Sequence, residues 1–194
     1  MKWSSNSVCN HSPAHLRLHL IELRGTGNSI AVEENVRGRL EVMFVGNNNR
    51  IHLGENVSFS EPVIVTMRCN NAVLEIGTGS TSEGSTFHFR EDGTSIIVGE
   101  DCMFARDTNF WVTDFHSILD LQSSERTNAA RQITIENHVW IGWGAKILKN
   151  VRVGTGSIVG TASVVTRDVA PHTIAFGVPA NEMKSNIDWS RKLL

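Results

Sequence analysis

The sequence places Asp114 and His116 two residues apart, immediately before a polar segment over residues 117–131. Histidine is the side chain that most readily takes and releases a proton near neutral pH, so His116 is a candidate general base. Asp114 is placed to fix the tautomer of that imidazole, a task that a backbone carbonyl or Glu125 would serve equally well. An ordinary polar residue at the end of a strand is the competing interpretation. The elements around His116 decide between them.

A six-residue repeat supplies those elements. Over residues 135–169 every sixth residue is aliphatic, a row made of Ile135, Ile141, Ile147, Val153, Val159 and Val165. Neither a helix nor an ordinary strand has that period. Glycine follows the aliphatic residue at Gly142, Gly154 and Gly160, where a tight corner needs a residue without a side chain. The pattern predicts an all-β fold, a parallel β-helix whose coils each contain three hexapeptides.

A looser form of the repeat extends upstream. Val32, Leu53, Ile76 and Val98 occupy equivalent positions, and their separations of 21, 23 and 22 residues fit one coil with small corner insertions. We therefore predict a single domain over residues 1–194 with a solenoid over residues 25–180. Residues 1–24 would form a first rung or a cap, and residues 181–194 a tail or a short helix over the open end.

Composition excludes several classes of function. A formal net charge of -2 gives no electrostatic case for binding nucleic acid. No apolar run approaches the ~20 residues of a membrane span, and the opening residues lack the apolar stretch of a signal peptide, so we expect a cytoplasmic protein. Cys9, Cys69 and Cys102 form no CxxC pair, which predicts free thiols rather than disulfides or a thiolate zinc site.

The repeat is interrupted at His116. Val98, Phe104 and Phe110 keep the six-residue spacing, His116 is the next residue in step, and the hexapeptides resume only near Ile135. The intervening residues 117–131 are too long and too polar for a corner. We predict an extruded loop, and long loops on a rigid scaffold commonly carry function.

Three features together resemble a known family: the D-x-H sequence before the loop, HVWIGWGAKIL over residues 138–148, and VRVGTGSIVGTASVVTRDVAPHTIAFGVPA over residues 151–180. They resemble the hexapeptide-repeat acyltransferases of the left-handed β-helix class, and most of all the O-acetyltransferases of bacterial surface polysaccharides. The resemblance implies a left-handed coil, acetyl-CoA as donor with no metal, and a sugar or glycan hydroxyl as acceptor. It also implies a homotrimer with the site between subunits, possible peripheral association with the surface-polysaccharide assembly, and cytoplasmic location.

The resemblance also assigns roles to residues. His116 would be the catalytic base, with Asp114 beside it and the indole N–H of Trp140 steadying the acetyl group. Contacts to coenzyme A would come from backbone amides and from side chains near its adenosine and phosphates, at Gly142, Trp143, Thr161, Thr166, Arg167, Pro179 and Lys184. Trp143 departs from the family pattern, in which many members have a small residue lining the acetyl-CoA channel.

The acceptor and the competing functions stay open at this stage. His88, Arg90 and Trp111 lie close enough to the predicted catalytic coil to line a sugar site, and core packing is the alternative for the aromatic residues near them. An amine acceptor, as in N-acetyltransferases, would leave the same residues in place. A γ-carbonic-anhydrase-like zinc site would need His88, His116 and His138, without the H-x4-H pair of that class. A non-enzymatic solenoid would not need the loop.

Overall fold

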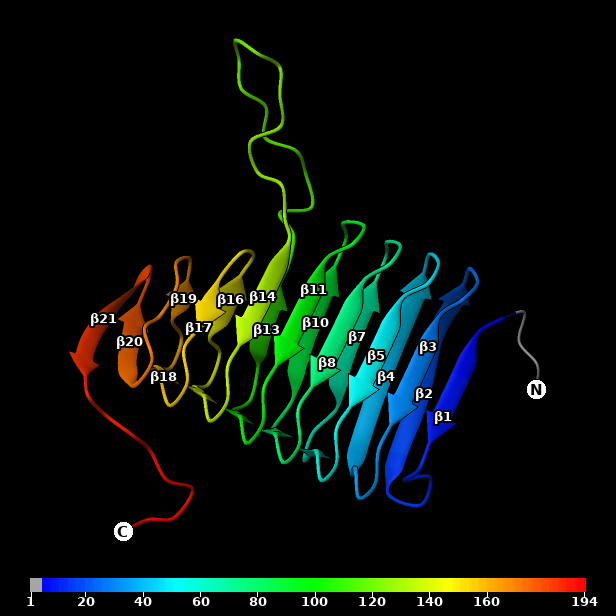
Figure 1. Ribbon diagram of the computed structural model, residues 1–194, viewed down its shortest axis with the longest axis horizontal. Helices are drawn as coiled ribbons and strands as arrows, with labels where there is room; N and C mark the ends of the chain where they lie inside the picture. The colour runs from blue at the N-terminus through cyan, green and yellow to red at the C-terminus, as the bar shows by residue number, and fades with distance from the viewer. Residues whose placement is uncertain (1–4) are drawn as a thin grey trace.

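The computed structural model describes residues 5–194, and over these residues the chain forms 21 strands and no helix. Figure 1 shows a parallel solenoid whose strands stack side by side along one axis, with one long loop projecting from an edge. The strands form three sheets of seven strands each, which are the three sides of the solenoid. The predicted all-β parallel solenoid is confirmed. Within the same residues, nothing forms a helix of the length and hydropathy that a bilayer crossing requires.

Sheet 1 begins each coil. Its strands are all parallel and comprise β1 (Ser7–Asn10), β3 (Ser29–Val32), β5 (Arg50–Leu53), β8 (Val73–Ile76), β11 (Ser95–Val98), β14 (Gln132–Ile135) and β17 (Arg152–Val153). Sheet 2 ends each coil and is also parallel throughout. Its strands are β2 (Leu16–Arg24), β4 (Gly38–Val45), β7 (Val63–Met67), β10 (Ser85–Phe89), β13 (Thr108–Trp111), β16 (Lys146–Leu148) and β19 (Val164–Val165).

Sheet 3 lies between them along the chain. It contains β6 (Ser58–Phe59), β9 (Thr81–Ser82), β12 (Met103–Phe104), β15 (Trp140–Ile141), β18 (Ile158–Val159), β20 (Thr173–Gly177) and β21 (Ala180–Ser185). Only the last pair of this sheet, β20 with β21, is antiparallel. A chain that passes from sheet 1 to sheet 3 and then to sheet 2 turns three corners in each coil. The corner between sheets 2 and 1 therefore lies opposite sheet 3.

The predicted equivalence of the coils is confirmed by strand register. Val32 pairs with Leu53, which pairs with Ile76, and Ile76 pairs with Val98. The same row continues through Ile135 and Val153. All six side chains are at most 3% exposed, so they form one continuous apolar column inside the solenoid. Burying one such aliphatic side chain contributes about 1.5–3 kcal/mol, which is why the six-residue period specifies the fold.

Close contact between coils explains the glycine corners. A Cβ atom on Gly142 would lie 2.7 Å from the backbone nitrogen of Thr161, and one on Gly154 would lie 2.5 Å from that of Pro171. Both distances are shorter than a real Cβ contact tolerates. At other corners an asparagine takes the left-handed conformation, as at Asn35, where φ is 58°.

The two ends of the chain extend the solenoid. β1 and β2 pair in parallel with β3 and β4, so the N-terminal strands are the first of sheets 1 and 2. At the other end we predicted a tail or a short helix, and no helix forms. Residues 180–185 instead form β21, which pairs with the open edge of β20, and residues 186–194 follow without regular structure. The edge of β20 offers unpaired backbone groups, which a strand satisfies and a helix would not.

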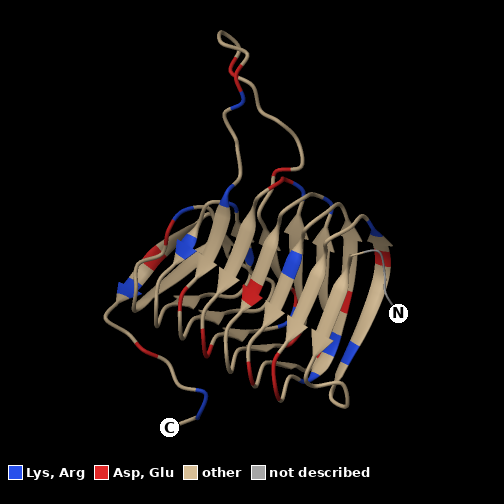
Figure 2. Ribbon diagram, turned by 45° about the vertical axis from the view of Figure 1, so that its right-hand side comes forward, with Lys and Arg blue, Asp and Glu red and all other residues tan. Residues whose placement is uncertain are grey.

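Charged residues of both signs are interspersed along the solenoid and on the loop (Figure 2). The three cysteines are free, with Cys9 exposed and Cys69 and Cys102 buried, as predicted.

Candidate active site

The backbone around His116 is held while its side chain is left open. β13 ends at Trp111, and the next residues carry the chain to the corner between sheets 2 and 1. The amide of His116 donates to the carbonyl of Asp114 at 2.8 Å, and the carbonyl of His116 accepts a hydrogen bond of 2.8 Å from the side-chain amide of Asn128. Phe115 between them has a φ of 62°, which turns the chain sharply. His116 itself is exposed, so an incoming hydroxyl has access to its imidazole.

Asp114 is engaged by other partners than the imidazole. Its carboxylate forms an ion pair of 2.6 Å with Lys149 and accepts a hydrogen bond of 2.8 Å from Asn128. Burial raises the pKa of this carboxyl, but the Lys149 and Asn128 contacts outweigh burial and lower it overall. Asp114 is therefore ionised at neutral pH. Asp114 is linked to His116 through the backbone and through Asn128, and no side-chain contact between the two is present in residues 5–194.

Asn128 connects the two ends of the loop. Besides Asp114 and the His116 carbonyl, it accepts hydrogen bonds on its side-chain oxygen from the amide of Ile118 at 2.9 Å and from Arg126 at 3.0 Å. Its own backbone carbonyl accepts a bond from Lys149 at 3.1 Å. The side chain is 7% exposed, so each of these bonds is shielded from water. Asn128 thus fixes the base of the extruded loop next to His116.

A second ion pair supports the same corner from the preceding coil. Glu91 pairs with Arg126 at 2.8 Å and also accepts bonds from the Ala130 amide and the Thr113 hydroxyl. Burial opposes the ionisation of Glu91, but the hydrogen bonds from Arg126 and Ala130 lower its pKa overall. The loop base is therefore closed by two carboxylates that are both charged at neutral pH.

Two of the three predicted acceptor residues meet beside His116. His88 and Trp111 are neighbours in sheet 2, and their rings contact edge-on with centroids 5.3 Å apart. Phe115 contacts both rings, at 6.3 Å from His88 and 5.6 Å from Trp111. Burial lowers the pKa of His88, which keeps the ring neutral near pH 7. Arg90 is exposed just after β10, on the same edge of sheet 2.

One polar atom in this aromatic cluster has no partner. Within residues 5–194 the indole nitrogen of Trp111 is the only buried side-chain nitrogen or oxygen that makes no hydrogen bond. An unsatisfied buried donor costs about 1–3 kcal/mol. Phe115, whose side chain is 43% exposed, lies against this indole. The cluster therefore combines apolar ring surface with an unused donor, and its member Phe115 directly precedes His116 in the chain.

Trp140 lies on a different side of the solenoid. It is in β15 of sheet 3, between Met103 and Ile158, and is 37% exposed. His116 lies at the corner opposite that sheet. A single chain therefore does not bring the predicted base and the predicted indole donor together.

The predicted coenzyme A contacts fall into two groups. Gly142, Trp143 and Thr161 meet at adjacent corners between sheets 3 and 2, where the Trp143 carbonyl accepts a bond of 2.7 Å from Ala162. The amide of Gly142 is already used by the carbonyl of Val159. The amides of Trp143 and Thr161 donate to no acceptor among residues 5–194, and both residues are exposed. Two free donors at an exposed corner fit the amide-rich pantetheine arm.

Trp143 closes one side of that corner. Its indole donates to the carboxylate of Asp107 at 3.2 Å, while 56% of the residue remains exposed. The ring is therefore tethered to the preceding coil and borders the corner rather than filling the interior.

The second group lies near the C-terminal end. Arg167 donates to the side chain of Asn181 at 2.8 Å, and the two line a cavity of 250 Å³ with Glu182. Lys184 is exposed on β21 opposite Ile174. Pro179 sits at the turn between β20 and β21, and the amide of Gly177 just before it bonds Ser163 at 3.1 Å. Thr166, also exposed, directly precedes Arg167.

The histidines do not converge on a metal site. His88 lies in β10, His116 at the corner before the loop, and His138 at a corner between sheets 1 and 3. Residues 5–194 contain no group of three or more His, Cys, Asp or Glu side chains with the geometry to hold a metal ion.

Sequence reasoning missed several residues of this region. Asn128, Lys149 and Glu91 reach the site from the loop and from neighbouring coils, and no local pattern marks them. Phe115 could have been found from the sequence, because it is the middle residue of the D-x-H sequence.

Comparison with known proteins gives the following. The solved structure of the polySia-specific acetyltransferase NeuO matches with a TM-score of 0.79 at 32% sequence identity, covering 97% of this chain and 90% of that one. The polysialic acid O-acetyltransferase of Neisseria meningitidis is 27% identical over 197 residues, covering 90% of this chain and 91% of the relative. No family model matches the chain.

A third relative is more similar over a shorter stretch. The polysialic acid O-acetyltransferase of Escherichia coli O1:K1 / APEC is 36% identical over 111 residues. This match covers 57% of the present chain and 36% of the relative, so the chain spans about a third of that protein's length.

Proposed function

This chain belongs to the hexapeptide-repeat β-helix acetyltransferases, and on that premise we propose that it transfers the acetyl group of acetyl-CoA to a hydroxyl of an acidic polysaccharide. The observation that carries the proposal is the setting of His116. Its backbone is fixed by Asp114 and Asn128 while its imidazole stays exposed beside an aromatic cluster. The fixed backbone limits the positions that the imidazole can take, and its exposure leaves it open to an incoming hydroxyl.

The proposed reaction is a single acyl transfer. A ring nitrogen of His116 takes the proton of the acceptor hydroxyl, whose oxygen forms a bond to the thioester carbonyl carbon. The carbon–sulfur bond then breaks, and the imidazolium returns the proton to the leaving thiolate. The indole N–H of Trp140 donates to the acetyl oxygen, where negative charge develops.

The acceptor is proposed to lie on the cluster of His88, Trp111 and Phe115. Aromatic faces stack on sugar rings, and rotation of the exposed Phe115 side chain would give an acceptor oxygen access to the unpaired indole nitrogen of Trp111. Arg68 and Arg90 are exposed at the same edge of successive coils, with the Arg68 amide bonded to the carbonyl of Phe89. Such a row of cations favours a chain of carboxylates, the chemistry of the polysialic acid named for the relatives.

We place the donor at the corner of Trp143 and Thr161, with Arg167 and Lys184 toward the phosphates. The two free amides and the two exposed cations support this placement. Gly142 has no side chain at this corner, and its amide is already bonded to the carbonyl of Val159.

A trimer with a shared site follows from the separation of His116 and Trp140. If both groups act on one acetyl group, a neighbouring chain must supply one of them, and a ring of three closes such head-to-tail contacts. We also propose a cytoplasmic location, which fits three free cysteines in a reducing compartment.

An acceptor panel tests the function. The purified protein is incubated with acetyl-CoA and either polysialic acid, a neutral glucan or no acceptor, while thiol release and O-acetyl groups are measured by absorbance and NMR. We expect O-acetyl product with the acidic polymer, and a KM for it that rises in Arg68→Ala and Arg90→Ala and with added salt. Thiol release without acetylated polymer, or equal transfer to the neutral glucan, would contradict the proposed acceptor.

A further inference from the structure

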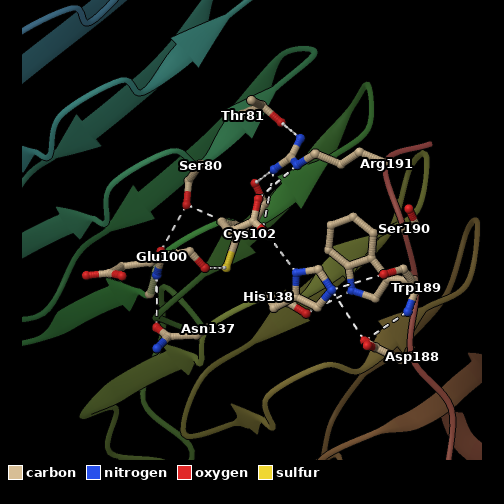
Figure 3. Close-up of polar contacts among 12 residues, drawn as sticks. Ser80, Thr81, Glu100, Cys102, Asn137, His138, Asp188, Trp189, Ser190 and Arg191 are labelled. Atoms are coloured by element: carbon tan, nitrogen blue, oxygen red, sulfur yellow. Dashed lines mark hydrogen bonds and ion pairs between the residues drawn. The ribbon is translucent and has the colours of Figure 1, made fainter.

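The irregular C-terminal tail is anchored on sheet 3 by one buried tryptophan. Trp189 is 8% exposed, and its ring stacks on His138 with centroids 4.1 Å apart and planes 5° from parallel. Its indole nitrogen donates to the carbonyl of His138 at 2.8 Å (Figure 3). Trp189 lies outside the solenoid interior, so its burial is produced by the tail folding back onto the outer face.

The imidazole of His138 is bonded on both nitrogens to groups that only accept. Nδ1 lies 2.6 Å from a carboxylate oxygen of Asp101, and Nε2 lies 3.0 Å from the backbone carbonyl of Trp189. A neutral imidazole has one N–H and satisfies one such acceptor. Both bonds together require the doubly protonated ring. His138 is therefore held as an imidazolium between the solenoid and the tail.

Arg191 also contacts Trp189 and bonds residues of sheet 3 and its corner. Its guanidinium donates to Asp101 at 2.9 Å, to the hydroxyl of Thr81 at 2.9 Å and to the carbonyl of Cys102 at 3.0 Å. Its central carbon lies 5.6 Å from the centre of the Trp189 ring, within cation–π range. Figure 3 shows His138 and Arg191 both next to the Trp189 ring. We call residues 188–191 the strap.

The strap lies next to Trp140, the residue proposed to donate a hydrogen bond to the acetyl oxygen. Thr81, Met103, Trp140 and Ile158 are paired neighbours in sheet 3, and Arg191 contacts the first of them. The ring of Trp189 lies 6.1 Å from that of Trp140 at 50°. Trp140 thus has Trp189 on one side while 37% of it remains exposed.

We propose that Trp189 is a positioning residue: the strap fixes the ring orientation of Trp140 so that its indole N–H meets the acetyl oxygen. This inference rests on the proposed function, because it assigns a purpose to the strap only if Trp140 serves acetyl transfer. An exposed indole on a two-residue strand has several rotamers available, and the tilted ring of Trp189 beside it restricts which of them fit.

The proposal predicts that attachment of the strap, and with it activity, depends on pH through His138. The charged groups that face the His138 ring are Asp101, from the turn before β12, and Asp188, from the strap, and Arg191 of the strap pairs with Asp101. Burial lowers the pKa of His138, but the bonds to Asp101 and Trp189 and the two aspartate charges raise it overall from 6.5. Burial raises the pKa of the nearby Cys102 thiol to about 11, so it stays neutral.

The sign follows from the raised pKa. The bonds of His138 hold the strap fully below pH 6.5 and are lost as pH rises through the raised pKa. Once the proton is lost, one ring nitrogen faces an acceptor without a hydrogen, and the longer bond to the Trp189 carbonyl is the one to break. Activity should then fall on the alkaline side.

Kinetics of strap variants test the positioning role. Trp189→Ala should lower kcat about tenfold while the KM for acetyl-CoA stays within about twofold, because orientation and not binding is lost. Trp189→Phe keeps a stacking ring and should recover most of kcat. Asp101→Asn should move the alkaline limb of the kcat profile to lower pH. Lys192→Ala, a change at an exposed residue of the same tail, is the matched control and should leave kcat unchanged.

An activity-free measurement separates this inference from the proposed function. An NMR titration of His138 should give a pKa above 6.5 in the wild type and a lower one in Trp189→Ala. If the wild type transfers no acetyl group, the proposed function fails while the titration still reports the strap. A wild-type His138 pKa at or below 6.5 overturns the strap. A Trp189→Ala protein with a lowered His138 pKa but unchanged kcat overturns the positioning role.

Discussion

The pair of residues that the sequence singled out for chemistry is joined by a third. Asp114 and His116 do not contact through their side chains. Asn128 lies between them, with its amide on the Asp114 carboxylate and on the His116 carbonyl. A buried amide that makes several hydrogen bonds sets geometry more rigidly than one exposed carboxylate would. We therefore propose that His116 transfers the proton and that Asn128 fixes the position of the His116 backbone.

Asn128→Ala tests that assignment. It should lower kcat about ten- to a hundredfold, since several shielded bonds to a charged group and to the His116 backbone are lost together. The KM for acetyl-CoA should change little, because the proposed donor corner lies elsewhere. Steady-state kinetics against Gln122→Ala, an exposed position on the same loop, provide the measurement. A loss no larger than that of Gln122→Ala would remove Asn128 from the account.

Arg167→Ala tests the donor placement. Its guanidinium is proposed to meet phosphates far from the reacting thioester, so its loss should raise the KM for acetyl-CoA several-fold to about a hundredfold and leave kcat near its wild-type value. Asn181→Ala removes the present partner of Arg167 without removing the charge and is the matched comparison. An unchanged KM with a depressed kcat would mean that the donor lies elsewhere.

Among the secondary-structure elements, those that repeat a local six-residue pattern could be predicted from the sequence. The aliphatic column from Val32 to Val153 was predictable because each member repeats a local pattern, and the pairing of the strands confirms it. The contacts of Lys149 with Asp114 and of His138 with Trp189 join residues 35 and 51 positions apart and leave no periodic signal. The strand β21 was missed for the same reason, because it exists to satisfy the edge of β20.

The stability that the Asp114 and Glu91 ion pairs contribute at the loop base should fall at low pH. The pKa of Asp114 lies below its ordinary 3.8 and that of Glu91 below its ordinary 4.5. Their contribution to stability is present above those values and is lost as pH falls through the lowered ones. The free energy of unfolding of the wild type should therefore exceed that of Asp114→Asn with Glu91→Gln by a constant amount above pH 5, measured by urea titration. The excess should shrink below about pH 4, and an excess that persists at lower pH would contradict this ion-pair account.

In the whole molecule, the two groups proposed to act on the acetyl group lie on different sides of one solenoid. His116 occupies the corner between sheets 2 and 1, and Trp140 the outer face of sheet 3. If both groups act on one acetyl group, a neighbouring chain in a ring would have to supply one of them. The assembly is thus a requirement of the proposed chemistry.

Mixed assemblies test this requirement. His116→Ala and Trp140→Ala, each impaired alone, are unfolded together, refolded and assayed. If neighbouring chains supply the two groups to a ring of three, about a quarter of the sites in a random mixture regain both, and activity should recover to about that fraction. No recovery above the sum of the separate variants, or an active monomer by light scattering, would show that one chain suffices.

His116 is proposed to remove the proton of the acceptor hydroxyl, and the turnover of His116→Ala tests that role. Turnover of the variant and of the wild type is compared with acetyl-CoA and polysialic acid, while calorimetry reports coenzyme A binding and His15→Ala, an exposed histidine remote from the loop, serves as control. We predict a kcat at least about a hundredfold lower with coenzyme A affinity retained. A variant that turns over at close to the wild-type rate would contradict the account.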